Sequence, residues 1–287
     1  MKIVSFATEN HVGLENLKLS LSKVNGWEHT IIGLNTKWKG WITRMQAYRD
    51  FCKNLENQNE IIVFSDAYDV LCLQSSETFL ELYQEFANDK IIIGAEIGCA
   101  ANCFPPTQWW SENDIQKDAK RKFVNGGLIA GSAKMIGTMW EWAIEQKFDD
   151  DQIALGHYTN TYPDLIFLDV NSLFFFNDHD AVSSYDIKED NSLIENGKAL
   201  KPFFIHFHGL NIHTSVPFTN SKKTLFEVGK NYKKVGAQIN GDDHITSFPP
   251  DYRSSNLGIW VERSGFFLLF FIFLFVLFAL IIYKNKH

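Results

Sequence analysis

The sequence predicts an α/β fold: a mostly parallel, Rossmann-like sheet flanked by helices, followed by one C-terminal transmembrane helix. Three observations support this prediction. Short apolar runs alternate with amphipathic stretches along the first third of the chain. Acidic residues follow one of these runs directly, as they do at the ligand-binding edge of a parallel sheet. A run of uncharged, mostly apolar residues, GFFLLFFIFLFVLFALIIY, occupies positions 265–283.

The elements are predicted in alternation. Apolar runs predict strands at 3–7, 29–34, 60–64 and 90–95. Apolar residues at helical spacing predict intervening helices at 12–24, 43–57 and 76–88. This β-α-β-α-β-α-β order favours a parallel sheet with helices on both faces. Beyond it, strands are predicted at 123–130, 167–170 and 203–207, and a helix at 136–146.

Composition excludes some classes of protein. The chain has 287 residues and a formal net charge of -7, so a nucleic-acid-coating protein, which needs excess Lys and Arg, is not expected. An acidic protein that handles anionic phosphates needs a bridging cation. The four cysteines are too few for a disulfide scaffold, and their spacing is not that of a structural zinc site.

The C-terminal part of the chain is predicted to anchor the protein in a membrane. Residues 265–283 are long enough to cross a hydrocarbon core of roughly 30 Å, after a linker at 235–264 and before a short tail at 284–287. No signal peptide is visible at the N-terminus, so we expect tail-anchored insertion with the domain at 1–234 in the cytosol. The lysines in the tail favour the alternative, lumenal orientation by the positive-inside rule.

One motif predicts a divalent-metal site. Asp66 and Asp69 follow the apolar strand at 60–64, and carboxylates at the end of a strand suit hard cations. A phosphohydrolase of the aspartyl-phosphate type is a weaker interpretation, because it needs aspartates at i and i+2 and the spacing here is i+3. A solvated loop with two incidental aspartates remains the plain alternative.

Three further motifs could carry chemistry or be ordinary surface. The acidic run DDDQ at 149–152 could bind a ligand or form a solvated turn. The segment FIHFHG at 204–209 could supply imidazole to a metal or be a histidine pair on an edge strand. The segment NGG at 125–127 could bring backbone close to a ligand or form a plain turn.

Taken in order, these motifs resemble those of the glycosyltransferase domain of the procollagen lysyl hydroxylases and, more distantly, other GT-A enzymes. The resemblance covers roughly residues 2–234 and implies a GT-A fold. The matching segments are DAYDV at 66–70, FVNGG at 123–127, DDDQI at 149–153, FLDV at 167–170 with FFFN at 174–177, and HG at 208–209.

The resemblance implies a Mn²⁺ site and a UDP-sugar donor. The implied metal ligands are Asp66, Asp69 and His208. The residues implied to bind the nucleotide and its phosphates are Tyr68, which would stack on uracil, with Thr8, Arg44, Glu96 and Gly209. The residues implied to line the donor-sugar and acceptor side, where catalysis occurs, are Asn125, Asp150, Asp151 and Gln152.

The expected function is Mn²⁺-dependent transfer of a hexose, glucose or galactose, from a UDP-sugar to a hydroxyl acceptor. The acceptor would be a hydroxylysine-linked sugar on protein or another glycan. The family's H-G-N is H-G-L here, and no hydroxylase domain or iron site is visible, so collagen as acceptor does not follow. Two alternatives stay open: a transferase acting on lipid or surface polysaccharide, and a sugar-nucleotide-binding membrane protein that has lost catalysis.

Overall fold

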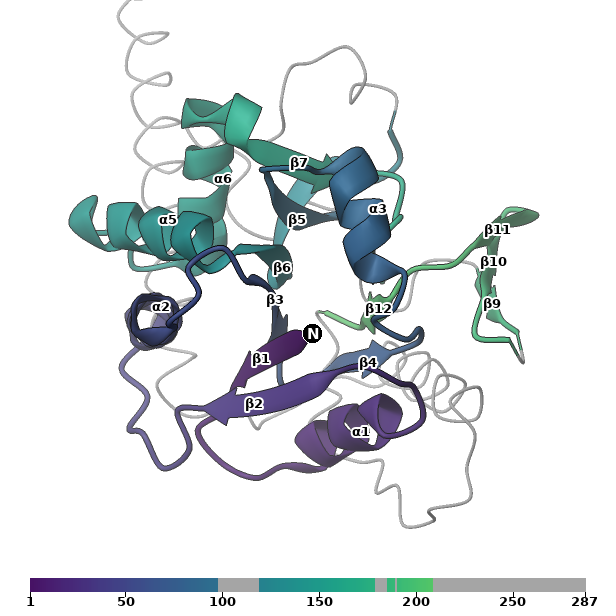
Figure 1. Cartoon of the computed structure of the whole chain (residues 1–287), viewed down its shortest axis with the longest axis horizontal. Helices are drawn as coiled ribbons and strands as arrows, with labels where there is room; N and C mark the ends of the chain where they lie inside the picture. The colour runs from purple at the N-terminus through teal and green to yellow at the C-terminus, as the bar shows by residue number, and fades with distance from the viewer. Residues whose placement is uncertain (98–118, 179–184, 189, 209–287) are drawn as a thin grey trace, which may run out of the picture. The chain divides into compact units, whose positions relative to one another are not determined.

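The computed structural model describes residues 1–97, 119–178, 185–188 and 190–208 (Figure 1). The chain divides into two units, Met1–Ile245 and Thr246–His287, and all described residues belong to the first. No helix within the described ranges is long and apolar enough to cross a membrane. The predicted linker, transmembrane helix and tail at 235–287 lie outside the described residues.

A central sheet of six strands, in the order β2-β1-β3-β6-β5-β7, organises the described domain. The strands are β1 (Lys2–Phe6), β2 (Glu28–Ile32), β3 (Ile61–Asp66), β5 (Ile91–Glu96), β6 (Phe123–Ser132) and β7 (Ile166–Asp169). β1 pairs in parallel with β2 and β3, and β5 pairs in parallel with β7. β6 lies between β3 and β5 and runs antiparallel to both, so the sheet is mixed.

Helices cover both faces of this sheet, as predicted (Figure 1). They are α1 (Val12–Leu21), α2 (Trp41–Asn54), α3 (Phe79–Phe86), α5 (Ala133–Glu145) and α6 (Asp151–Thr161). Successive strand residues point to opposite faces, so Val4 packs in the core under α2, α5 and α6, while Ile3 packs in the core under α1 and α3. Both strand residues are fully buried.

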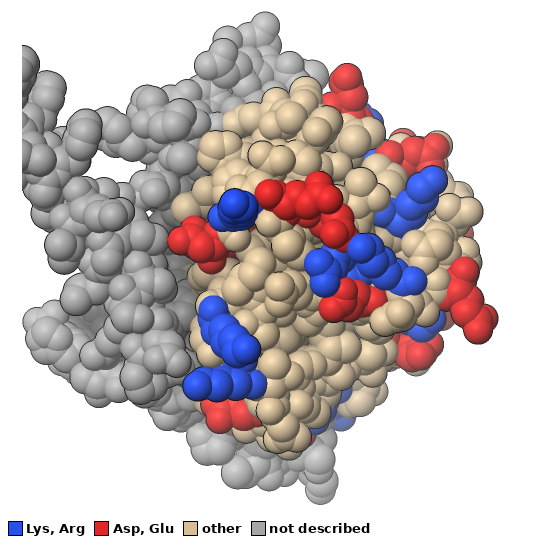
Figure 2. Space-filling model, turned by 90° about the vertical axis from the view of Figure 1, so that its left-hand side faces the viewer, with Lys and Arg blue, Asp and Glu red and all other residues tan. Residues whose placement is uncertain are grey.

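The outer face of the molecule shown in Figure 2 carries acidic and basic side chains side by side. Ion pairs of this kind join α2 to α5, where Arg49 and Lys53 both approach Glu141. Such exposed pairs contribute little to stability, at most about 1 kcal/mol each. The buried apolar residues between the helices and the sheet therefore stabilise this layer more than its surface charges do.

Two smaller sheets complete the described domain. One has the order β4-β12-β8, and the other has the order β11-β10-β9. Their strands are β4 (Val70–Cys72), β8 (Phe175–Asn177), β9 (Tyr185–Ile187), β10 (Leu193–Glu195), β11 (Lys198–Leu200) and β12 (Phe204–His206). β12 is antiparallel to β4 and parallel to β8, which places His206 opposite Val70 and Asn177.

Candidate metal centre

The ends of strands from distant parts of the chain form the candidate site. β1 and β3 are parallel, with Phe6 opposite Asp66, so the segments that follow them leave the sheet at the same edge. Asp69 lies in the turn from β3 to β4. β12 then pairs with β4 and brings His206 to this turn.

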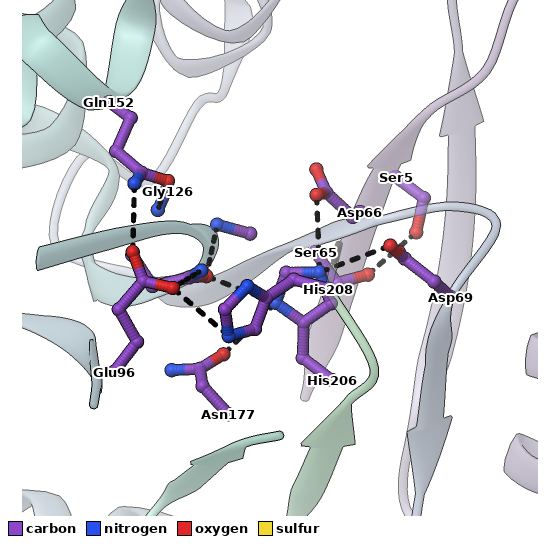
Figure 3. Close-up of polar contacts among 12 residues, drawn as sticks. Ser5, Ser65, Asp66, Asp69, Glu96, Gly126, Gln152, Asn177, His206 and His208 are labelled. Atoms are coloured by element: carbon purple, nitrogen blue, oxygen red, sulfur yellow. Dashed lines mark hydrogen bonds and ion pairs between the residues drawn. The ribbon is translucent and has the colours of Figure 1, made fainter. Parts of the chain in front are cut away.

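Asp66, Asp69 and His206 form a cluster whose potential ligand atoms all lie within 4.8 Å of one another (Figure 3). The Nε2 atom of His206 is 3.5 Å from Oδ2 of Asp66 and 3.3 Å from Oδ2 of Asp69. Two carboxylates and an imidazole are a suitable ligand set for Mn²⁺, which accepts both oxygen and nitrogen donors.

The histidine of this cluster differs from the sequence prediction, which named His208. The Nε2 atom of His208 lies 3.0 Å from Oε2 of Glu96, a fully buried carboxylate of β5. The two imidazole rings are neighbours, with centroids 5.3 Å apart. His206 is the nearer to the aspartates because it is the β12 residue paired with β4, directly beside the turn that holds Asp69.

The surroundings of His206 fit a bound cation. Its Nε2 atom is buried and makes no hydrogen bond, although it faces two carboxylate oxygens. Burial lowers the pKa of His206, but the charges of Asp69 and Asp66 outweigh burial, and the pKa is raised. The site therefore favours positive charge at this point, which either a proton on Nε2 or a divalent cation would supply.

Two glycines allow other groups to pack closely against the backbone in and next to the cluster. A Cβ atom added to Gly127 would lie 2.1 Å from Cε1 of His206 and 2.9 Å from Oδ2 of Asp66. A Cβ atom on Gly13 of α1 would lie 1.9 Å from the carbonyl oxygen of Tyr68. The NGG motif, which lies in β6, thus brings backbone close to the imidazole ring of the cluster, and its approach to a ligand stays a prediction.

Arg44 connects the cluster to the acidic run. This buried α2 residue forms ion pairs with Asp66 and Asp151, and its guanidinium lies 4.6 Å from the ring centroid of Trp41. Burial lowers the pKa of Arg44, but the two aspartates raise it above its ordinary value. Burial raises the pKa of Asp151, and Arg44 opposes that rise. In this structure Arg44 thus contacts protein carboxylates.

The three aspartates of the acidic run have three different environments. Asp149 is exposed, whereas Asp151 is buried. Asp150 is the N-cap of α6, because its Oδ1 atom accepts a hydrogen bond from the backbone N–H of Ile153 at 2.9 Å. The acidic run is therefore the start of a helix and not the solvated turn that was one of its two interpretations, and helix capping was the sequence signal that could have revealed it.

Glu96, Asn125 and Gln152 form one internal hydrogen-bond network. The side-chain amides of Asn125 and Gln152 donate to the Glu96 carboxylate at 3.3 and 3.0 Å. The Oε1 atom of Gln152 also accepts from the backbone N–H of Gly126 at 3.1 Å. These contacts bring together three predicted site residues from β5, β6 and α6, and their direct contact with substrate remains a prediction.

The predicted nucleotide side lies at the N-terminus of α1. The hydroxyl of Tyr68 donates to the backbone carbonyl of Glu9 at 3.2 Å, and its ring meets the ring of His11 edge to face. Thr8 follows β1 in the same segment, with its carbonyl accepting from the backbone N–H of Asn35. Tyr68 and Thr8 are thus brought to one region beside the aspartate cluster, while Gly209 lies outside the described residues.

The described domain thus has an acidic cluster with one histidine at a strand edge and a buried acid–arginine pair beside it. Residues 1–223 match the family described as PLOD GT domain. The chain therefore belongs to this glycosyltransferase-domain family, and the resemblance read from its motifs is confirmed.

Animal proteins share this segment. The chain is 28% identical over 228 residues to a multifunctional procollagen lysine hydroxylase and glycosyltransferase of Caenorhabditis elegans, covering 72% of this chain and 30% of that protein. It is 26% identical over 231 residues to a procollagen-lysine,2-oxoglutarate 5-dioxygenase of Drosophila melanogaster, covering 74% of this chain and 31% of that one. The chain thus spans under a third of the length of these relatives.

A solved structure is also similar. The galactosyltransferase LgtC, solved with donor and acceptor sugar analogues, aligns with a TM-score of 0.43 and 11% identity, covering 88% of this chain and 99% of that one. This similarity is too low to support an argument about function.

Proposed function

We propose that this protein is a metal-dependent glycosyltransferase that moves a hexose from a UDP-sugar to a hydroxyl acceptor. The observation that carries the proposal is the Asp66–Asp69–His206 cluster at the strand edge, in a chain of this family. Mn²⁺ held there would neutralise the diphosphate of the donor and the charge that develops on it as the sugar leaves.

The residues around the cluster suit the parts of such a donor. The ring of Tyr68 lies on one side and offers a stacking surface for uracil, while its backbone carbonyl packs against Gly13. Arg44 pairs with both Asp66 and Asp151, so Asp151 also lies close to the cluster. A carboxylate there can stabilise the positive charge that develops on the sugar in the transition state.

The acceptor is proposed to be a glycan hydroxyl, including a hydroxylysine-linked sugar on protein. A transferase acting on lipid or surface polysaccharide is the second candidate, favoured by the apolar segment at 265–283. The third candidate, a sugar-nucleotide-binding protein without catalysis, is disfavoured because Asp66, Asp69 and His206 are all present and clustered.

The direct test is UDP release from a panel of UDP-hexoses, with and without Mn²⁺, and with and without candidate acceptors. Release that needs both Mn²⁺ and an acceptor supports the transferase, and the acceptor that works separates the first two candidates. Mn²⁺-dependent UDP binding without release or transfer supports the third. No binding of UDP in the presence of Mn²⁺ contradicts the proposal as a whole.

The apolar segment at 265–283 supports a membrane-anchored enzyme. We propose that the domain faces the cytosol, with the lumenal orientation as the alternative. Protease added to intact microsomes checks this orientation: a cytosolic domain is digested at once, whereas a domain that survives until detergent is added is lumenal.

A further inference from the structure

Two amide side chains flank the Nδ1 atom of His206. The Oδ1 atoms of Asn125 and Asn177 each lie 3.0 Å from this nitrogen. Asn125 is 2% exposed and Asn177 is fully buried, so these contacts are shielded from water. Figure 3 shows Asn177 and His206 side by side, with the two aspartates at the other end of the imidazole ring.

Other contacts fix which end of each amide faces the ring. The Nδ2 atom of Asn177 donates to the backbone carbonyl of Ala95 at 3.1 Å. The Nδ2 atom of Asn125 donates to the Glu96 carboxylate at 3.3 Å, and its Oδ1 atom accepts from the N–H of Gly127 at 2.9 Å. A carbonyl and a carboxylate can only accept, so reversing either amide would lose a hydrogen bond and face two acceptors to each other.

The Nδ1 atom of His206 therefore faces two acceptors and has to carry a hydrogen. In the neutral imidazole the lone pair is then on Nε2, the buried atom that faces Asp66 and Asp69. A cation held at the cluster would use this lone pair of Nε2, while the hydrogen on Nδ1 would stay between the two asparagines.

We propose that Asn177 is a positioning residue which, together with Asn125, fixes the tautomer of His206 and so presents Nε2 to the metal. This inference rests on the proposed metal-dependent function. Asn177 comes from β8, the parallel neighbour of β12, and pairs with His206 in the register of that sheet. Gly94 leaves room for it, because a Cβ atom there would lie 2.6 Å from Nδ2 of Asn177.

The test compares Mn²⁺ affinity in two variants, measured from the electron paramagnetic resonance signal of free Mn²⁺ with UDP present. Asn177→Leu keeps a similar volume but cannot accept from Nδ1, and its affinity should fall about 10–100-fold. Asn177→Asp can still accept from Nδ1 with one oxygen and, as a protonated carboxyl, donate to the Ala95 carbonyl with the other, so it should keep affinity within a few-fold of the wild type. Thr159→Val is the control, since it removes a buried hydroxyl that bonds within α6 and should leave Mn²⁺ affinity unchanged.

A second comparison distinguishes an effect of Asn177 through the His206 imidazole from a general disturbance of the fold. In a His206→Gln background, Asn177→Leu should cause no further loss of Mn²⁺ affinity, because its effect acts through the imidazole. Equal losses in both backgrounds, or no loss in either, overturn the inference. If Asn177→Leu does not fold, Asn177→Asp decides: retained affinity supports the acceptor role and a 10-fold loss overturns it. A wild type that binds neither Mn²⁺ nor UDP contradicts the proposed function instead.

Discussion

Arg44 and Asp151 stand 107 positions apart in the sequence and form a buried ion pair, with Nε of Arg44 2.5 Å from Oδ2 of Asp151. The same guanidinium pairs with Asp66 of the metal cluster. One side chain of α2 therefore joins the proposed metal side of the site to the proposed sugar side. Because Arg44 and Asp151 are both buried, removing the guanidinium leaves the Asp151 carboxylate without its charged partner, while Asp66 still faces His206.

We expect Arg44→Gln to destabilise the metal-free protein by about 3–5 kcal/mol, the usual loss when one partner of a buried pair is removed. Adding Asp151→Asn should recover part of this loss, because the unpaired carboxylate is then gone. Urea unfolding in a chelator measures both. Lys53→Gln, which breaks an exposed pair with Glu141, is the control and should change stability by at most about 1 kcal/mol.

Removal of one carboxylate charge from the candidate metal cluster should abolish the proposed turnover. Asp69→Asn keeps the shape of the side chain but removes its charge, and UDP release should fall by more than ~100-fold. Asp149→Asn alters an exposed aspartate of the acidic run and should leave the rate near that of the wild type. Near-normal release by a folded Asp69→Asn protein would show that the cluster is not the working metal site.

The two neighbouring glycines of the NGG motif should respond differently to alanine. Gly127→Ala places a methyl group against the His206 ring and should lower Mn²⁺ affinity by at least 10-fold. A Cβ atom on Gly126 meets Leu155 at 3.5 Å, an ordinary contact, so Gly126→Ala should bind Mn²⁺ almost normally. Calorimetric titration of both variants checks this, and similar affinities for the two would contradict the close packing described at Gly127.

Variants of Tyr68 test nucleotide binding independently of the transfer reaction. If its ring stacks on uracil, Tyr68→Ala should weaken UDP binding by about 1–3 kcal/mol, the scale of base–aromatic stacking. Tyr68→Phe keeps the ring and loses only the hydroxyl that donates to Glu9, so its UDP affinity should change little. Equal affinity of wild type and Tyr68→Ala for UDP in the presence of Mn²⁺ rules the stacking out.

His29 should make the fold sensitive to mild acid. Burial, followed by the charge of Lys18, lowers the pKa of His29 from 6.5 to about 4. The pKa of His29 is lower in the folded protein than in the unfolded one, so the unfolded state takes up the proton first as the pH falls. The free energy of unfolding is therefore unaffected by His29 above pH 6.5 and decreases as the pH falls from 6.5 towards 4. The loss is on the order of 2–3 kcal/mol.

The measurement for His29 compares wild type with His29→Gln, which can still bond to Ser5 but does not titrate. The difference between their free energies of unfolding should shift in favour of the glutamine variant by this amount between pH 6.5 and 4. Taking the difference removes the contributions of the buried carboxylates, which titrate in both proteins. A difference that stays constant across this range would contradict the lowered pKa.

The spacing of apolar residues predicted those strands and helices in which this spacing is regular. The strands and helices of the first third of the chain appear within a few residues of their predicted ends, because each shows one clear apolar face. The antiparallel direction of β6 was not predictable in this way, since residue alternation is the same in both directions. α6 was missed because its acidic start looked like a turn.

The site was predictable where its residues are close in sequence and less so where they are not. Asp66 and Asp69 share one turn after a strand, and their proximity follows from the motif. His206 and His208 are two positions apart on one segment, and only the pairing of β12 with β4 decides which one reaches the aspartates. Asn177 ends the matching segment FFFN at 174–177, but that segment did not indicate its contact with His206, which depends on the residue that lies opposite it in the sheet.

The late position of β12 has a consequence for synthesis of the protein. The aspartates leave the ribosome long before His206 does, and at roughly 5–20 residues per second the interval is on the order of ten seconds. During that time β4 has no partner from β12, and Asn177, made 29 residues before His206, has no imidazole to contact. If the cluster holds the proposed cation, the nascent domain cannot bind it through the full ligand set, and metal binding has to come late in synthesis.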